Sequence, residues 1–445
     1  MKPLFLSLLL AALLLSCSTT ADKINVVPET VTDVKSTPEN PEDIENPPLS
    51  PADVLNVHTA IKRPEGGEQT EEEILRTIMK TMSLKEKIGQ LFILQIRYNG
   101  DGSPRREVDE DLNLFLNDFK PGGIILFREN IVDNQQVESL ISNLQIFSRI
   151  PLFISVDEEG GLVSRLGKVP EVNVTLLPPA LSIGNKNNSE LAYNAGLVLG
   201  RELRALGVNM DMAPVADVNT NPENPVIGNR AYSSDPQTAG KMVTEVIRGF
   251  HKYDIASVIK HFPGHGDTSF DTHVGTVVLP FNRDRLDTVE FIPFELGIEA
   301  GTDAIMTAHI VMSGISSLPL PATLNPEIIT GIIREEFGFD GLVISDALEM
   351  GAIRENYTPE ESAVAGIKAG LDILLMPEDQ LSAFKALLDA VHCGEISEKR
   401  IDESVYRILR TKYERKILFP EPAGESIEDV QNDPAHLALI QSFLN

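Results

Sequence analysis

Eight short apolar stretches stand out along the chain, and most of their residues are β-branched, aliphatic or aromatic. Each stretch is continuous rather than alternating with polar positions. Such a pattern is typical of strands buried on both faces, as in a parallel sheet covered by helices. We therefore predict eight buried strands, at Leu91–Ile96, Gly123–Phe127, Leu152–Asp157, Val208–Met212, Ser257–His261, Ala304–His309, Leu342–Asp346 and Ile373–Met376.

Amphipathic helical patterns lie between most of these stretches. Examples are Asp133–Ser148, Glu190–Leu206, Thr238–Tyr253 and Pro326–Phe337, and Asp133 is a favourable N-cap residue. Eight strand–helix units in about 350 residues predict an α/β fold of the (β/α)8 TIM-barrel type. A doubly wound open sheet has the same alternation and remains the alternative. That fold normally carries a glycine-rich phosphate loop after its first strand, and this sequence has none there.

The first sixteen residues are predicted to be a signal peptide rather than part of the fold. Lys2 precedes an apolar stretch, Leu4–Leu15, that is too short to span a bilayer and ends in small residues. Leu14-Leu15-Ser16-Cys17 resembles the bacterial lipobox, which implies that Cys17 is lipidated and begins the mature chain. An ordinary signal peptide with an incidental cysteine is the alternative. The expected location is an exported, membrane-anchored lipoprotein in the cell envelope or periplasm.

Residues 17–72 are rich in Pro, Glu, Asp, Thr and Asn. Such a composition buries too little apolar surface to offset its chain entropy, so this segment is predicted to be a disordered tether. The barrel is expected to occupy residues 73–445. Contact with a membrane would then occur only through the N-terminal lipid.

The charge of the chain excludes one class of partner. The 445 residues include 38 Lys and Arg against 66 Asp and Glu, which gives a net charge of −28. Phosphate backbones are bound by clustered cations, so no nucleic-acid partner is expected. The two cysteines cannot form a disulfide framework, and the sequence contains no Cys-x-x-Cys pair.

Ionisable residues end four of the eight predicted strands. These residues are Asp157, Lys260 with His261, His309 and Asp346. An ionisable group at the end of a buried strand is costly unless it is paired or solvated in a cleft. Barrel enzymes place their active sites at the C-terminal ends of the strands, so these residues predict a polar site on that rim.

The segment from Lys260 to His273 carries the densest candidate chemistry, including three of the eight histidines of the chain. Its His and Asp residues could bind a metal ion. Alternatively, a histidine oriented by a carboxylate could act as an acid and a base, and Asp271 lies close enough to His273 for such a pair. The first predicted strand, Leu91–Ile96, has no pair of metal ligands, which weakens the metal interpretation.

The same segment resembles the signature of the β-N-acetylglucosaminidases of glycoside hydrolase family 3. It reads Lys260-His261-Phe262-Pro263-Gly264-His265-Gly266-Asp267-Thr268, followed by Asp271-Thr272-His273. Four further stretches agree with this family in order and spacing. They begin at Gly122 (GGIILF), Asp157 (DEEGGLVSR), Gly228 (GNRAY) and Ser345 (SDALEM). The resemblance covers residues 73 to 440 and implies a barrel, in agreement with the strand pattern.

The resemblance also implies a role for individual residues. Asp346 matches the catalytic nucleophile, His273 the acid/base and Asp271 its partner. The positions that hold the terminal N-acetylglucosamine are matched by Asp157, Arg165, Arg230, Lys260 and His261. We expect His265 and Asp267 to shape the loop, and Gly264 and Gly266 to act as its hinges. No metal or organic cofactor is expected.

The expected activity is that of an exo-acting, retaining β-N-acetylglucosaminidase. Its substrates would be β-linked glycans ending in N-acetylglucosamine, including peptidoglycan fragments (muropeptides). Many family members have a second α/β domain, and this chain is expected to have the barrel alone. The alternatives are a phosphorylase on the same scaffold, a non-catalytic sugar-binding lipoprotein, and a metal-dependent hydrolase that uses His261, His265, Asp267 and His273.

Overall fold

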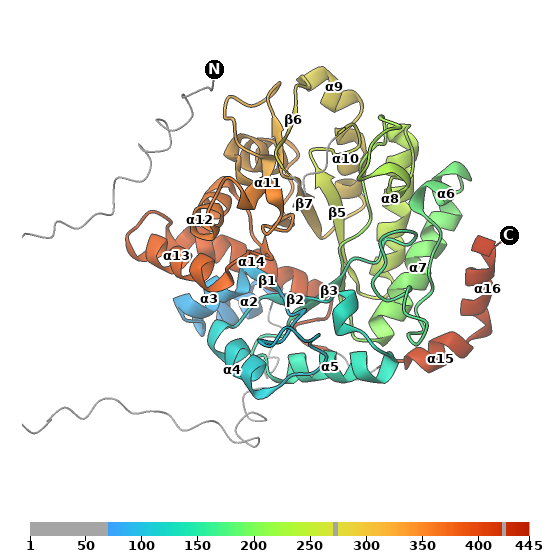
Figure 1. The fold of residues 1–445 in the computed structure, drawn as a ribbon, viewed down its shortest axis with the longest axis horizontal. Coiled ribbons are helices and arrows are strands. Elements are labelled where there is room, and N and C mark those ends of the chain that lie inside the picture. Colours follow the sequence, from blue (N-terminus) through green and yellow to red (C-terminus); the bar gives the residue numbers. More distant parts are fainter. Residues whose placement is uncertain (1–69, 270–274, 421–423, 445) are drawn as a thin grey trace, which may run out of the picture. The chain divides into compact units, whose positions relative to one another are not determined.

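A computed structural model of the chain describes residues 70–269, 275–420 and 424–444. Eight parallel strands form one sheet in the order β10-β1-β2-β3-β4-β5-β7-β9 (Figure 1). A parallel bridge between Ile344 and Ile373 joins the two ends of this order, and the Asp372 N–H donates to the Val343 carbonyl at 2.8 Å. The sheet therefore closes into a TIM-type barrel, which confirms the predicted fold and rules out the open-sheet alternative.

Each predicted apolar stretch coincides with one strand of the barrel. The strands are β1 (Phe92–Gln95), β2 (Gly123–Ile125), β3 (Phe153–Val156), β4 (Met210–Asp211), β5 (Ala256–Phe262), β7 (Ala304–Thr307), β9 (Leu342–Ser345) and β10 (Leu374–Leu375). A separate parallel pair, β6 (Val277–Leu279) with β8 (Ile310–Met312), was not predicted from the sequence.

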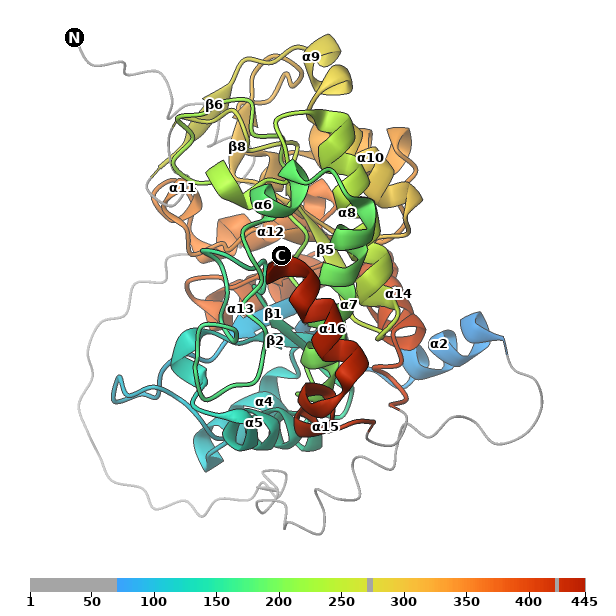
Figure 2. The same ribbon diagram turned by 90° about the vertical axis from the view of Figure 1, so that its right-hand side faces the viewer.

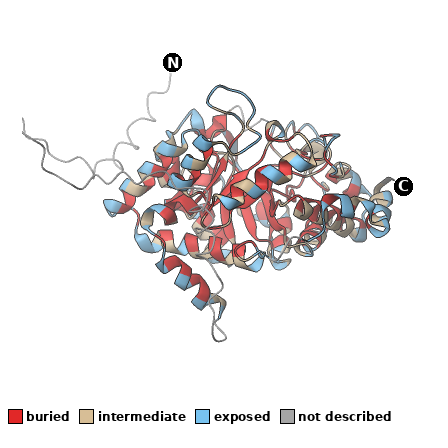
Figure 3. Ribbon diagram, turned by 90° about the horizontal axis from the view of Figure 1, so that it is seen from below, coloured by how far each residue is buried: buried red, intermediate tan, exposed pale blue. Residues whose placement is uncertain are grey.

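Helices surround the strands in Figure 1, and their outward faces are largely exposed in Figure 3. The α-helices are α2 (Glu71–Lys80), α3 (Leu84–Gln90), α4 (Glu110–Phe119), α5 (Asn134–Ile146), α6 (Ala180–Asn185), α7 (Ser189–Ala205), α8 (Pro236–His251), α9 (Arg283–Thr288), α10 (Phe291–Glu299), α11 (Gly351–Arg354), α12 (Pro359–Ala369), α13 (Gln380–His392), α14 (Glu398–Glu414), α15 (Ile427–Asn432) and α16 (Pro434–Leu444). Short helical segments are η2 (Arg128–Asn130), η3 (Gly228–Arg230), η4 (Ala322–Leu324) and the π-helical η5 (Glu327–Glu336).

The four helical patterns identified in the sequence correspond to α5, α7, α8 and η5. Asp133 caps α5 as predicted, because its carboxylate accepts a hydrogen bond from the Gln136 N–H at 2.8 Å. Helix α2 begins at Glu71, slightly before the expected start of the barrel. Among the described helices, none is long and apolar enough to cross a membrane.

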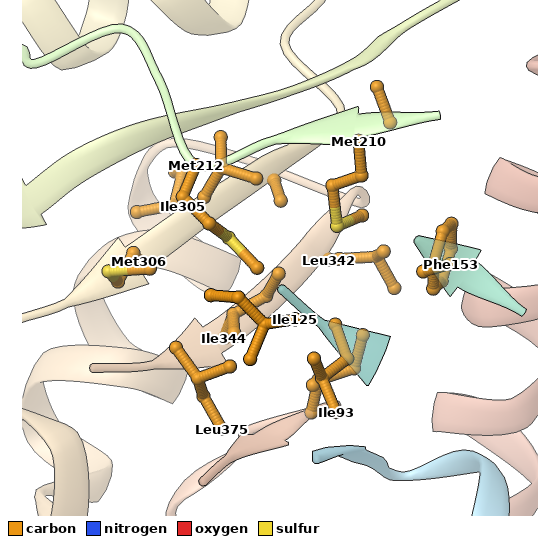
Figure 4. Close-up of a cluster of buried hydrophobic side chains, with 14 of the residues drawn as sticks. Ile93, Ile125, Phe153, Met210, Met212, Ile305, Met306, Leu342, Ile344 and Leu375 are labelled. Atoms are coloured by element: carbon orange, nitrogen blue, oxygen red, sulfur yellow. The ribbon is translucent and has the colours of Figure 1, made fainter. Parts of the chain in front are cut away.

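Buried aliphatic, methionine and aromatic side chains from the strands hold the barrel together. Figure 4 shows side chains from β1, β2, β3, β4, β7, β9 and β10 converging on one apolar cluster. Burying each such side chain stabilises the folded state by roughly 1.5–3 kcal/mol. These side chains fill the interior of the barrel below the rim, which is therefore packed rather than open. The described residues predicted to form the site lie at the rim.

The last two helices pack against the outside of α7 (Figure 2). Glu202 of α7 is fully buried, and its carboxylate contacts His436 Nε2 at 2.9 Å and accepts from Gln431 Nε2 at 2.8 Å. Both partners belong to the C-terminal helices, so one buried carboxylate anchors this segment to the barrel.

Candidate active site

A cavity of about 360 Å³ opens at the C-terminal ends of the barrel strands. Six of the residues predicted to form the site line it, namely Asp157, Arg165, Arg230, Lys260, His261 and Asp346. The structure therefore brings together residues that are up to 189 positions apart (346 − 157) in the chain. Barrel geometry explains this convergence, because every parallel strand delivers the residue after it to the same rim.

Asp157 directly follows β3 and pairs with two cations. Its Oδ1 accepts from Lys260 Nζ at 2.9 Å, and its Oδ2 accepts from Arg165 Nη2 at 3.1 Å. Burial would raise the pKa of the Asp157 carboxyl, but Lys260 and Arg165 outweigh that effect and hold the pKa well below its usual range. Asp157 is therefore an ionised acceptor, suited to charge-assisted hydrogen bonds with sugar hydroxyls.

Glu159 organises the other side of the same cluster, although the sequence analysis gave it no role. Its carboxylate accepts from Arg230 Nε and Nη2 at 2.8 Å each, and Lys260 Nζ lies 2.7 Å from its Oε1. Burial acts to raise the pKa of Glu159, yet Lys260 and Arg230 lower it to about 2. Glu159 stands inside the motif that begins at Asp157. Its role was missed because the sequence alone does not show that its carboxylate pairs with the two cations Lys260 and Arg230.

Asp346 directly follows β9 and lies in the cavity wall. Its backbone N–H donates to the Thr307 carbonyl at 3.0 Å, and its Oδ1 accepts from the Ala347 N–H at 2.7 Å. Burial would raise the pKa of the Asp346 carboxyl, but His261, then His309 and the Ala347 N–H, lower it overall. The carboxylate is thus fixed in place and ionised, which a nucleophile requires.

His309 also lies at a strand end, as the sequence predicted, but it contacts residues next to the cavity instead of lining the cavity itself. The residue is fully buried and is absent from the cavity lining. Its Nδ1 lies 2.8 Å from Thr323 Oγ1, and its Nε2 lies 2.9 Å from the Ala347 carbonyl oxygen. His309 therefore restrains the backbone next to Asp346.

His261, near the end of β5, is bonded to a buried carboxylate that the sequence analysis did not select. Its Nδ1 lies 2.7 Å from Asp217 Oδ2, and Asp217 is 1% exposed. His265 also lines the cavity, so it does more than shape the loop. Burial is the main cause that lowers the pKa of the His265 imidazole, which favours its neutral form. Asp267 lies 3.9 Å from Arg285 and not in the cavity lining, in keeping with a role in loop shape.

The two glycines expected as hinges are required by close packing. Gly264 has φ of 134°, and a Cβ there would lie 2.7 Å from Glu290 Cγ. A Cβ on Gly266 would lie 1.9 Å from the Val218 carbonyl oxygen. Steric fit to neighbouring segments therefore accounts for both glycines without any hinge motion.

Three of the predicted residues fall outside the part of the chain that the structure describes. They are the proposed acid/base His273, its partner Asp271 and the predicted lipidation site Cys17. Within the described ranges, no group of three His, Cys, Asp or Glu side chains could hold a metal ion.

The wall of the cavity nearest β1 carries a further charged pair. Arg97 Nη2 donates to Glu349 Oε1 at 2.7 Å, and the Arg97 guanidinium lies 3.9 Å from the centre of the Phe127 ring. Both charged residues line the cavity, but neither was predicted to form the site, although Glu349 stands in the stretch that begins at Ser345. They add polar contacts on the side of the cavity that faces the strand ends of β1 and β9.

Comparisons with known proteins identify the family of the chain. The sequence profile described as "Glycosyl hydrolase family 3 N terminal domain" matches residues 83–411. The chain is 32% identical over 368 residues to "Beta-hexosaminidase A" of Pseudoalteromonas piscicida, a match that covers 74% of this chain and 61% of that relative. This chain thus spans about three fifths of the length of that curated relative.

Two solved structures are also similar. A glycoside hydrolase family 3 beta-N-acetylglucosaminidase from Paenibacillus sp. str. FPU-7 has a TM-score of 0.75 and 40% identity, over 82% of this chain and 68% of that chain. The beta-glucoside phosphorylase BglX bound to 2FGlc has a TM-score of 0.75 and 25% identity, over 84% of this chain and 67% of that chain. Because the family profile covers nearly the whole barrel, the chain belongs to glycosyl hydrolase family 3, as its motifs predicted.

Proposed function

We propose that this protein is an exo-acting, retaining β-N-acetylglucosaminidase that removes terminal N-acetylglucosamine from β-linked glycans. The observation that carries the proposal is the ionised Asp346 carboxylate in a cavity lined by the Asp157, Arg165, Arg230 and Lys260 cluster. The similarity to a hexosaminidase and to a β-N-acetylglucosaminidase supports this sugar specificity.

The first chemical step needs a nucleophile and an acid. The Asp346 carboxylate attacks the anomeric carbon and forms a glycosyl–enzyme ester, while the bond to the leaving oxygen breaks. His273, oriented by Asp271, donates its proton to that oxygen. In the second step the neutral His273 accepts a proton from water, which attacks the anomeric carbon, releases the sugar and restores the Asp346 carboxylate.

Binding of one sugar ring is assigned to the charged cluster. Asp157 and the cations Arg165, Arg230 and Lys260 offer an acceptor and several donors in one rigid arrangement, because Glu159 and Asp157 fix the cations by ion pairs. Such charge-assisted hydrogen bonds suit sugar hydroxyl groups, which both donate and accept. His261 adds a ring nitrogen from the end of β5.

The proposed natural substrates are peptidoglycan fragments, whose N-acetylglucosamine is β-linked. This proposal rests on export, which the apolar stretch before Cys17 predicts, and on attachment to a membrane by a lipid on that cysteine. Mass spectrometry of the mature protein tests the attachment. A diacylglyceryl adduct on Cys17 supports it, and an unmodified N-terminus or retention of residues 1–16 contradicts it.

The activity is tested by release of p-nitrophenol from its β-N-acetylglucosaminide by the full-length protein. Turnover is expected for the native chain, and losses of several orders of magnitude for Asp346→Ala and His273→Ala. Asp389→Asn, on the exposed face of α13, is the matched control and should retain activity. Labelling of Asp346 by a fluorinated sugar would identify the nucleophile. Saturable sugar binding without turnover would instead support the non-catalytic alternative, and loss of activity with EDTA the metal-dependent one.

Phosphorolysis is the second candidate, because one similar structure is a β-glucoside phosphorylase. Phosphate would then attack the glycosyl–enzyme in place of water and yield a sugar 1-phosphate. Product analysis by ³¹P NMR in phosphate buffer separates the two reactions. The hydrolase proposal expects free N-acetylglucosamine at every phosphate concentration.

A further inference from the structure

Asp217 does not line the cavity but contacts two residues that do, His261 and His265. The residue is 1% exposed and is absent from the cavity lining. It follows the segment where Val215 bridges Lys260 and where the Ala216 N–H donates to the Lys260 carbonyl at 2.7 Å. This pairing extends the β4–β5 contact beyond the end of β4 and places the Asp217 carboxylate beside His261.

Both oxygens of Asp217 are used by the segment that carries the family signature. Oδ2 lies 2.7 Å from His261 Nδ1, while Oδ1 accepts from the backbone N–H groups of His261 at 3.3 Å and His265 at 2.6 Å. One carboxylate therefore fixes the His261 ring and the turn that leads from β5 into the segment containing His273.

The Asp217 carboxylate fixes the tautomer and orientation of the His261 ring. Burial would raise the pKa of the Asp217 carboxyl, but its interactions with His261 and then with His265, whose N–H donates to it, lower that pKa overall. An ionised carboxylate beside Nδ1 requires a proton on that nitrogen. Nε2 is then the ring nitrogen left for the cavity that His261 lines.

The His261 ring in turn acts on the nucleophile. The groups whose charge or polarity acts on Asp346 are His261 and Lys260 from β5, His265 from the following turn, His309 after β7, and the Ala347 N–H. Among those that lower the pKa of Asp346, His261 is the largest. Asp217 is bonded to that histidine, and His261 and Asp346 line the same cavity.

We propose that Asp217 is a positioning residue for the reaction, which sets the tautomer and orientation of His261 in the cavity that Asp346 also lines. This inference rests on the proposed glycosidase function. It assigns a role to a buried carboxylate that does not line the cavity and does not belong to the Asp271–His273 pair.

The test is Asp217→Asn, which preserves size and leaves one oxygen to accept from the two backbone N–H groups. The amide nitrogen faces His261 Nδ1 and can only donate, so the ring must carry its proton on Nε2 instead. We expect kcat/KM for the p-nitrophenyl substrate to fall about 10- to 100-fold, as is common when a partner that orients a functional histidine is lost.

Asp303 provides the matched control at the opposite end of the barrel. This buried carboxylate likewise contacts a histidine, with Oδ2 3.0 Å from His251 Nε2, and accepts from the Ser257 N–H at 2.9 Å. Asp303→Asn should lower the melting temperature but leave kcat/KM unchanged. If Asp217→Asn behaves in the same way, Asp217 has only a structural role and the proposal is overturned.

A second measurement does not depend on turnover. The ¹⁵N chemical shifts of the His261 ring, assigned with His261→Gln, report which nitrogen carries the proton. We expect protonated Nδ1 in the native protein and protonated Nε2 in Asp217→Asn. An unchanged tautomer overturns the proposal even if activity falls. Absence of glycosidase turnover in the native protein would contradict the proposed function and leave the tautomer result to stand by itself.

Discussion

The Glu159 carboxylate accepts two hydrogen bonds from the Arg230 guanidinium, each 2.8 Å long. The same carboxylate lies 2.7 Å from Lys260 Nζ, so one buried anion holds two of the cations assigned to sugar binding. Bidentate pairing with Arg fixes the guanidinium plane as well as its position. The sugar-binding side of the cavity is therefore organised by a residue that is not expected to contact the sugar.

Glu159→Gln should weaken substrate binding more than chemistry. The neutral amide removes the charge that holds Arg230 and Lys260, while the Asp346 carboxylate stays in place. We expect KM for the p-nitrophenyl substrate to rise about 10-fold or more with a smaller change in kcat. Glu245→Gln, which alters a pair on the outer face of α8, should change neither constant. A loss confined to kcat would contradict this role for Glu159.

Glu159 should also make the stability of the folded protein depend on pH in the acidic range. Because the pKa of Glu159 in the folded state is about 2, below its ordinary value of 4.5, the folded protein binds its proton less readily than the unfolded chain. Its contribution is fully present above pH 4.5 and is lost as pH falls toward 2. We expect the melting temperature of Glu159→Gln to fall less steeply than that of the native protein between pH 5 and about 3. Parallel curves would contradict the prediction.

Lys412, at the end of the barrel opposite the cavity, should lower the stability of the folded protein at neutral pH. It is fully buried on α14, where its Nζ donates to Gln90 Oε1 at 2.9 Å and lies 4.9 Å from the centre of the Phe153 ring. Burial lowers the pKa of Lys412 well below its usual value. The unfolded chain therefore binds the proton more strongly, and stability should rise with pH from neutral to about 10.

Lys412→Met should therefore stabilise the folded protein. We expect the free energy of unfolding at pH 7 to rise by roughly 1–3 kcal/mol, because an ammonium group no longer has to be desolvated or deprotonated. The difference from the native protein should shrink at pH 9 in calorimetric melts. Lys399→Met on the same helix, where the side chain is 87% exposed, should have almost no effect. A less stable Lys412→Met protein would show that the hydrogen bond to Gln90 outweighs the cost of burial.

The strand pattern was recoverable from sequence because parallel barrel strands are buried on both faces and leave continuous apolar stretches. The ends of β4 and β10 could not be predicted, because in each only two residues of a longer apolar stretch form strand hydrogen bonds. The β6–β8 pair was missed because three-residue strands carry no periodic signal, and Val277 and Ile310 pair across more than thirty residues.

Six residues of the cavity were predicted because they follow strands or stand within long motifs. The missed residues were those whose role depends on a partner far along the chain. Glu159 and Asp217 become informative only when Lys260, Arg230 and His261 are brought to them by the closed barrel. Lys412 was missed for a related reason, because a lysine on an amphipathic helix normally indicates an exposed position.

The C-terminal helices should detach locally when their buried histidine is removed. His436 is 1% exposed and contacts Glu202, which also accepts from Thr175 Oγ1 at 2.7 Å and Gln431 Nε2 at 2.8 Å. His436→Ala leaves a gap beside a buried carboxylate, at a cost of about 1–3 kcal/mol. Because His436 is the buried polar side chain through which α16 contacts Glu202, we expect faster amide hydrogen exchange across α15 and α16, with the barrel strands unchanged. His392→Ala, at the exposed end of α13, is the control. Exchange that accelerates equally in the barrel strands would mean that these helices are part of the cooperative core rather than a separately anchored segment.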